Sequence, residues 1–224
     1  MALGRTNINL PEIPTPRVII EDEFQGTTLN TDLWTWRSDY TATCTVNNGI
    51  TISNGSDASN TKVNYLQLNR RFTGKEKRIT ASFTVTNITG SYKEARFGFF
   101  AGQEPSGLSG ESSGLYDLCG LIIMTSTYNN NHFSIYNASN LVSSGSVPWN
   151  IKEVGARISF PMVLRAEIDL MEETFAIYQG GTLLHSGTLP SNMEQAIGKP
   201  FLFITTQMFY ALSVTLANVS VVIE

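Results

Sequence analysis

The chain has 224 residues, 42% of them hydrophobic, and a formal net charge of −4, which suits one large domain with its own core. The acidic balance argues against a nucleic-acid-binding surface, because such surfaces need clustered basic side chains. No apolar run approaches the ~20 residues of a membrane-spanning helix, and the first residues lack the apolar segment of a secretory signal. We therefore expect neither nucleic-acid binding nor membrane insertion, and no signal peptide.

Residues 1–17 are predicted to form an extended N-terminal arm. Pro11, Pro14 and Pro16 lack amide donors and fix φ, so this segment cannot join the middle of a sheet. The arm also has too few apolar groups to fold alone. We predict that it docks on neighbouring protein subunits, in a homo-oligomer or a larger assembly.

Residues 18–224 are predicted to form one domain built of strands. Residues 43–46 and 50–52 flank Asn47-Asn48-Gly49, which indicates a hairpin because Asn and Gly tolerate positive φ. Residues 79–85 alternate between apolar and polar, as in a strand with one buried face and one wetted face. Similar patterns predict strands at 18–24, 63–68, 95–101, 118–125, 132–137, 162–170, 175–178, 182–186, 201–207 and 212–223.

Two short segments favour helix: a single capped turn at 30–34, and residues 191–198, which begin with a Ser cap and end in Gly. About a dozen strands with turn signals at short spacing predict an all-β, antiparallel β-sandwich of the jelly-roll kind. The charge run at 75–78 is predicted to be a solvated turn. Cys44 and Cys119 are predicted to be reduced thiols, with a disulfide as the alternative.

The segment from Asp22 to Trp34, DEFQGTTLNTDLW, resembles the opening of laminarinase-like and laminin-G-like domains. Two later segments, LRAEID at 164–169 and FAIYQGG at 175–181, resemble a consecutive strand pair of laminin-G-like domains. Together these likenesses imply a concanavalin A-like lectin/glucanase sandwich over residues 18–224.

In that family, the Leu and the Trp that correspond to Leu29 and Trp34 close one end of the sandwich, and the last strand pairs with the first. The resemblance indicates a fold and says little about function, because this fold hosts lectins, hydrolases, adhesion modules and virus surface proteins. Some relatives hold a structural calcium ion near the first and last strands. Glu21, Glu23 and Glu224 could supply oxygen ligands to such an ion; we predict no other metal and no cofactor.

Residues 167–172, EIDLME, resemble the catalytic signature of laminarinase-type β-glucanases. The resemblance implies Glu167 as nucleophile, Asp169 as the residue that orients it, and Glu172 as acid/base. Retaining hydrolysis needs its two carboxyl groups about 5–5.5 Å apart on either side of one bond. However, the string lies late in the chain, and strand alternation places Glu167 and Asp169 on an outer face while residues 171–174 form a hairpin turn. We predict that the chain is not an enzyme; a laminarinase-like endo-β-glucanase is the alternative.

A sugar-binding site needs an aromatic plane and a few planar polar groups. Residues of these types outside the predicted core are Trp36, Arg96, Tyr116, Tyr128, Trp149 and Arg165. The sequence thus predicts a non-enzymatic carbohydrate-binding, adhesion or structural surface protein, with a glycan or cell-surface polysaccharide as its partner. The arm suggests a virion decoration or appendage component, located on a virion surface or outside the cell after assembly or lysis.

Overall fold

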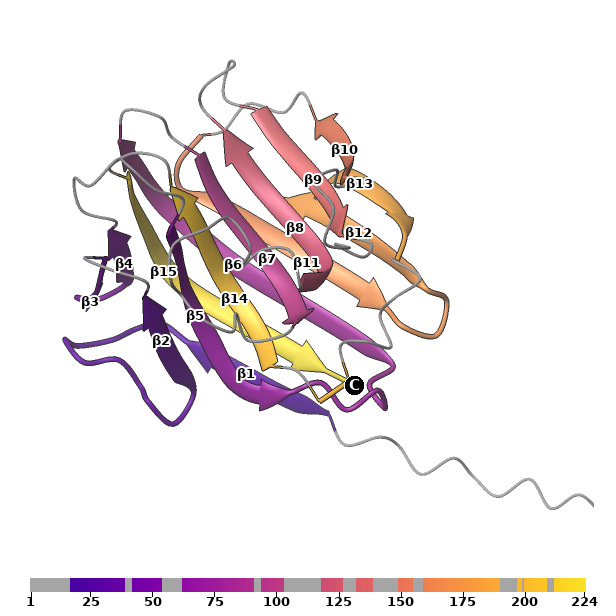
Figure 1. The fold of residues 1–224 in the computed structure, drawn as a ribbon, viewed down its shortest axis with the longest axis horizontal. Helices are drawn as coiled ribbons and strands as arrows, with labels where there is room; N and C mark the ends of the chain where they lie inside the picture. The colour runs from indigo at the N-terminus through magenta and orange to yellow at the C-terminus, as the bar shows by residue number, and fades with distance from the viewer. Residues whose placement is uncertain are drawn as a thin grey trace, which may run out of the picture.

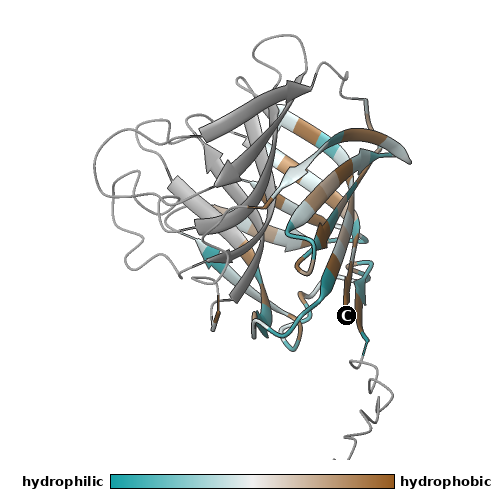
Figure 2. Cartoon of the chain, turned by 90° about the vertical axis from the view of Figure 1, so that its right-hand side faces the viewer, coloured by the Kyte–Doolittle hydropathy of each residue, from teal (hydrophilic) through white to brown (hydrophobic). Residues whose placement is uncertain are grey.

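The computed structural model describes residues 17–38, 42–53, 62–90, 94–102, 118–126, 132–138, 149–154, 159–189, 197–198, 200–208 and 212–224. Its strands form two antiparallel sheets, sheet A and sheet B, which face each other as two layers (Figures 1 and 2). The predicted antiparallel β-sandwich is therefore confirmed. Within the described part of the chain, no helix is long and apolar enough to cross a membrane.

Sheet A contains β1 (Val18–Asp22), β3 (Thr43–Val46), β4 (Ile50–Ser53), β6 (Arg78–Gly90), β11 (Met162–Asp169), β12 (Thr174–Gln179), β13 (Thr182–Thr188) and β15 (Leu212–Ile223). Their order is β13-β12-β11-β6-β15-β4-β3, and β1 also pairs with β15. Sheet B contains β2 (Trp34–Ser38), β5 (Lys62–Arg71), β7 (Glu94–Gly102), β8 (Leu118–Ser126), β9 (His132–Ala138), β10 (Trp149–Val154) and β14 (Pro200–Met208). Its order is β10-β9-β8-β7-β14-β5-β2.

The first and last strands pair, as the sequence resemblance implied. Val18 lies opposite Ile223, and the antiparallel register continues to Asp22 opposite Val219. On its other side β15 pairs along β6, so the C-terminal strand lies in the middle of sheet A. This arrangement brings residues 18–22, 78–90 and 162–169 onto one sheet although they are far apart in the sequence.

Among the described side chains, the core is filled by alternate residues of strands such as β6, β11 and β15. On β11, Met162, Leu164, Ala166 and Ile168 are buried, whereas the residues between them are partly or fully exposed. The same alternation of burial occurs on β6 and β15, and Figure 2 shows hydrophobic and hydrophilic residues alternating along the coloured strands. Strand periodicity thus assigned the inward and outward faces of β11 correctly.

The DEFQGTTLNTDLW segment closes one end of the core. Trp34 is 1% exposed and packs against Phe24 with ring centroids 5.9 Å apart. Asp22 holds the pair in place: its Oδ1 accepts the Phe24 amide at 2.7 Å, and its Oδ2 accepts Trp34 Nε1 at 2.7 Å. The predicted single turn before the tryptophan is also present, because the Asn30 carbonyl accepts the Trp34 amide at 2.9 Å and Asn30 Oδ1 accepts the Asp32 amide.

The hairpin between β3 and β4 forms as predicted at Asn47-Asn48-Gly49. Asn48 and Gly49 have φ angles of 47° and 139°. A side chain at position 49 would place Cβ 2.9 Å from the Leu216 carbonyl oxygen, so the close approach of β15 requires glycine there.

The charge run at 75–78 is not simply a solvated turn, which corrects the sequence interpretation. Glu76 is only 8% exposed, and its carboxylate accepts the amides of Thr73 and Lys75 and the Thr73 hydroxyl. Burial alone raises the pKa of such a carboxyl, but these hydrogen bonds and that of its own backbone amide outweigh burial and lower the pKa of Glu76. The last residue of the run, Arg78, is the first residue of β6.

Cys44 is a free thiol on β3, as predicted, and burial raises its pKa to about 11. The side chain of Cys119 lies outside the described residues, as do residues 1–16 of the predicted arm and most of the predicted helix at 191–198.

Candidate functional site

The outer face of sheet A gathers polar side chains from four neighbouring strands. Glu167 on β11 lies opposite Thr80 on β6 and Ala176 on β12, and Ala176 in turn lies opposite Ser186 on β13. Two residues along, Asp169 lies opposite Arg78 and Thr174. Because side chains alternate across a strand, both of these rows point away from the core.

These two rows line a surface groove with a volume of about 700 Å³, which we call the outer groove. The carboxylates of β11 stand along its middle, with β6 residues on one side and small residues of β12 and β13 on the other. Glu224 follows β15 and also lines the groove, because its backbone pairs with that of Arg78. The lining side chains include Arg78, Thr80, Glu167, Asp169, Ala176, Ser186 and Glu224.

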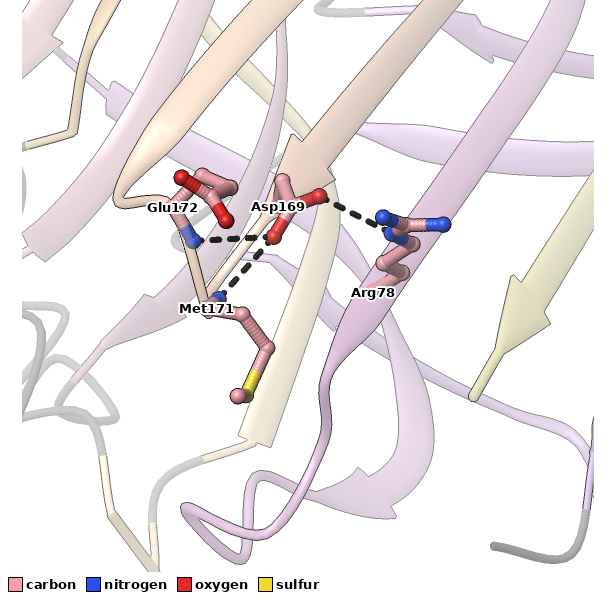
Figure 3. A network of polar contacts seen from close by, with 4 residues as sticks. All are labelled: Arg78, Asp169, Met171 and Glu172. Atoms are coloured by element: carbon pink, nitrogen blue, oxygen red, sulfur yellow. Dashed lines mark hydrogen bonds and ion pairs between the residues drawn. The ribbon is translucent and has the colours of Figure 1, made fainter. Parts of the chain in front are cut away.

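Asp169 is the most constrained carboxylate of the outer groove (Figure 3). Its Oδ1 accepts the backbone amides of Met171 and Glu172, both at 3.0 Å, and its Oδ2 accepts Arg78 Nε at 2.9 Å. The Glu172 amide is the main cause of a lowered pKa at Asp169, and the Arg78 side chain and the Met171 amide add to it against partial desolvation. Asp169 is therefore an ionised acceptor at neutral pH that fixes the turn from β11 to β12.

A second ion pair lies earlier on β11, before Asp169. Arg165 Nε is 3.1 Å from Glu167 Oε1, without hydrogen-bond geometry, so the contact is electrostatic. The Arg165 guanidinium also lies 4.4 Å from the centre of the Tyr178 ring, on the neighbouring strand. Both side chains are about two-fifths exposed, although the Arg165 Nε atom itself is buried.

The glucanase-like string is divided between strand and turn. Glu167 lines the outer groove, and Asp169 is held by Arg78 and by the turn. Glu172 is exposed in the turn itself and is not among the described residues that line the groove. The strand and hairpin turn predicted at 162–174 are thus confirmed.

The structure describes the side chains of two of the six predicted sugar-binding residues. Trp36 is half-buried on β2 and packs against the core, and Arg165 lies beside the outer groove. Arg96 belongs to β7 and Trp149 to β10, but their side chains lie outside the described residues. Tyr116 and Tyr128 lie wholly outside them.

The three carboxylates suggested for calcium do not converge. Glu21 lies opposite Ser220 on β15, and Glu224 lies four residues beyond Ser220. Four residues of a strand span about 13 Å, so the backbone positions of Glu21 and Glu224 are about that far apart. Glu224 Oε1 instead lies 3.5 Å from Arg17 Nε. The described residues contain no group of three or more His, Cys, Asp or Glu side chains that would hold a metal ion.

Sequence reasoning missed Arg78, Thr80, Ala176 and Ser186 as members of one site. Alternation marks each of them as outward-facing, which is the only signal that the sequence carries. Their proximity depends on the pairing of β6 with β11, whose residues are more than 70 positions apart in the chain.

No protein-family model matches the sequence, and no curated protein matches it. Solved structures do match its fold. Lectin I from Ulex europaeus, solved in complex with the methyl glycoside of α-L-fucose, superposes with a TM-score of 0.59 at 10% identity, covering 93% of this chain and 98% of the lectin. The carbohydrate recognition domain of Emp47p gives a TM-score of 0.57 at 12% identity, covering 91% of this chain and 93% of that domain.

A LamA variant from Zobellia galactanivorans, solved with laminaritriose and laminaritetraose, gives a TM-score of 0.56 at 11% identity and covers 92% of this chain and 98% of its own. At such identities the likeness concerns the fold alone. The chain therefore has the concanavalin A-like lectin/glucanase fold that its opening segment predicted.

Proposed function

We propose that this concanavalin A-like sandwich is a non-enzymatic carbohydrate-binding domain, and that the outer groove is its binding surface. The observation that carries the proposal is the state of the groove's carboxylates. Asp169 is fully engaged by Arg78 and by two backbone amides, and Glu172 lies outside the groove. What remains is an open surface with hydroxyl, carboxylate and guanidinium edges, which suits hydrogen bonding to sugar hydroxyls.

The alternative, a retaining β-glucanase, requires a nucleophile and an acid that face one glycosidic bond. The acid must hold a proton at working pH, which needs a desolvated carboxyl. Glu172 lies in the turn and does not line the groove, and the lowered pKa of Asp169 keeps that carboxyl ionised. These features support binding without hydrolysis.

Incubation with laminarin is expected to release no reducing sugar above the buffer blank. The reason is that only one carboxylate of the glucanase-like string, Glu167, lies free of the turn to face a bond in the groove. Reducing-end release would be measured alongside a β-glucanase as positive control. Hydrolysis that disappears in Glu167→Gln and persists in Glu173→Gln, an exposed carboxylate of the same turn, would establish the glucanase instead.

A more specific hypothesis than carbohydrate binding is that the protein serves adhesion or display on a virion or another assembled surface. It rests on the proline-containing sequence of residues 1–17 and on no structural contact. A solution mass of a trimer or larger, lost on deletion of residues 1–16, would support it. A monomer with and without the arm would leave carbohydrate binding standing and remove the assembly hypothesis.

A further inference from the structure

The loop between β5 and β6 concentrates positive charge in a chain that is acidic overall. Residues 70–78, RRFTGKEKR, hold five basic residues and one acidic residue, a formal charge of +4, whereas the whole chain carries −4. The one acidic residue, Glu76, is only 8% exposed, and its carboxylate accepts the amides of Thr73 and Lys75. The run thus keeps its acid inside the loop while basic side chains reach the surface. We call residues 71–77 the basic loop.

Arg71 and Lys75 are the exposed cations of the basic loop. Within the described part of the chain, neither side chain forms an ion pair with a carboxylate. An acidic turn, residues 171–174, adjoins the opposite end of the loop, where the Leu170 amide donates to the Lys77 carbonyl at 2.8 Å. The positive surface is therefore the part of the loop around Arg71 and Lys75.

Hydrogen bonds order the basic loop at both ends. At its start the Phe72 carbonyl accepts the Gly198 amide at 2.7 Å, and Arg71 Nη1 donates to the Gly198 carbonyl at 2.7 Å. At its end the Lys77 amide donates to the Glu224 carbonyl at 2.6 Å, next to the C-terminus marked in Figure 1. A ligand therefore meets cations on an ordered backbone, which reduces the conformational entropy lost on binding.

The outer groove begins next to the basic loop and has the opposite charge. Its lining side chains include three carboxylates and one arginine, which are Glu167, Asp169, Glu224 and Arg78. An anionic chain is therefore repelled from the groove and attracted to the loop. Duplex DNA is bound by broad basic surfaces that contact many phosphates, whereas two exposed cations match the acidic groups of a single polysaccharide chain.

We propose that the basic loop is a second binding surface, at which Arg71 and Lys75 bind the sulfate or carboxylate groups of an anionic polysaccharide. The Arg71 guanidinium offers a planar set of donors and the Lys75 ammonium a compact charge, and both pair with the oxygens of such groups. That the partner is a polysaccharide rests on the proposed carbohydrate-binding function. That it is anionic rests on the charge of the loop.

The test uses the full chain on an array of sulfated, uronic-acid-containing and neutral oligosaccharides. Sulfated or uronic-acid-containing glycans are expected to bind, and their affinity should fall at least about tenfold between low and high NaCl, because salt screens the charges of an exposed site. An array on which only neutral glycans bind would overturn the inference and leave the proposed function in place. An array without any bound glycan would overturn both.

The location is tested with two substitutions that remove the same charge. Lys75→Gln is expected to weaken binding of the anionic glycan about fivefold, the scale for one cation at an anionic surface. Arg37→Gln is the control, because Arg37 lies opposite Tyr65, six residues and about 20 Å from Arg71 along β5. It should stay within about twofold, since that distance exceeds the screening length. Equal effects of the two would show that only the net charge of the protein matters and would overturn the inference.

Loss of charge is separated from loss of fold by Lys75→Arg, which keeps the charge and is expected to bind the anionic glycan as the unchanged protein does. Far-UV circular dichroism of every variant confirms that the sandwich is folded. Dextran sulfate and duplex DNA serve as soluble probes, of which dextran sulfate is expected to bind more tightly. DNA that binds as tightly as dextran sulfate, or more so, would overturn the assignment of the loop to a polysaccharide.

Discussion

Trp34→Ala is expected to lower the free energy of unfolding by about 3–5 kcal/mol, the range for truncating a buried aromatic side chain. Trp34 is 1% exposed, packs against Phe24, and donates its indole N–H to Asp22 at 2.7 Å. Truncation opens a cavity at the end of the core and leaves the Asp22 carboxylate without one of its donors. Urea unfolding followed by far-UV circular dichroism measures the loss.

Trp36 provides the matched control. It lies two residues further along β2, on the same side of the strand, and is only half-buried against the core. Trp36→Ala is therefore expected to cost less than half as much as Trp34→Ala. If Trp34→Ala does not fold, Trp34→Phe tests the same point, because it keeps most of the ring volume and loses only the indole donor. Equal losses at positions 34 and 36 would show that Trp34 does not close the core.

Glu76→Gln is expected to lower the free energy of unfolding at pH 7 by about 2 kcal/mol, the scale of hydrogen bonds to a charged group. The carboxylate accepts the amides of Thr73 and Lys75 and the Thr73 hydroxyl while only 8% exposed. Glutamine offers one acceptor oxygen in place of two, so at least one donor of the loop is left without a partner. Glu173→Gln, on an exposed turn, is the control and should change stability by less than about 0.5 kcal/mol.

The hydrogen bonds to the Glu76 carboxylate also predict how the free energy of unfolding depends on pH. The pKa of Glu76 is lower in the folded state than in the unfolded chain, so its contribution is fully present above the unfolded pKa of about 4.3. The contribution is lost as the pH falls through the folded pKa, because protonation removes the charge that the amides stabilise. The difference between the unchanged protein and Glu76→Gln should therefore be constant from pH 7 to 5 and shrink toward pH 3. A difference that grows on acidification would contradict this account.

Local patterns were sufficient for much of the fold. The alternation at 162–170 assigned the buried and exposed faces of β11, and Asn47-Asn48-Gly49 located a hairpin, because both depend on residues close together in the chain. The interpretation of Glu76 as a solvated residue was wrong, because its surroundings depend on how the loop folds and not on the residues next to it in the sequence. A charged residue within a charged run is normally solvated, and only the folded loop shows that the amides around it compensate for its burial.

Residues 167–172, the glucanase-like string, also show that contacts between distant strands cannot be predicted from local sequence. The sequence correctly placed Glu167 and Asp169 on an outer strand face and the following residues in a turn. It did not indicate that Asp169 would meet Arg78, and Arg78 itself was assigned to a loop. A pair of opposite charges across two strands depends on which strands are neighbours, and pairing between distant segments leaves no local periodic signal.

The sequence by itself predicted most of the strands, though not β2 or β10, the inward and outward faces of β6 and β11, and the segment that closes the core, because these follow from period-2 alternation and turn chemistry. Only the tertiary structure decided that β6, β11, β12 and β13 lie side by side, with β15 next to β6. That neighbourhood places Arg78, Thr80, Glu167, Ala176 and Ser186 around one groove and brings Arg78 against Asp169. The physical reason is that the core needs only apolar residues on the inner faces of the strands, and many strand orders would provide them. The composition of the outer face, in contrast, depends on the single strand order that the chain adopts.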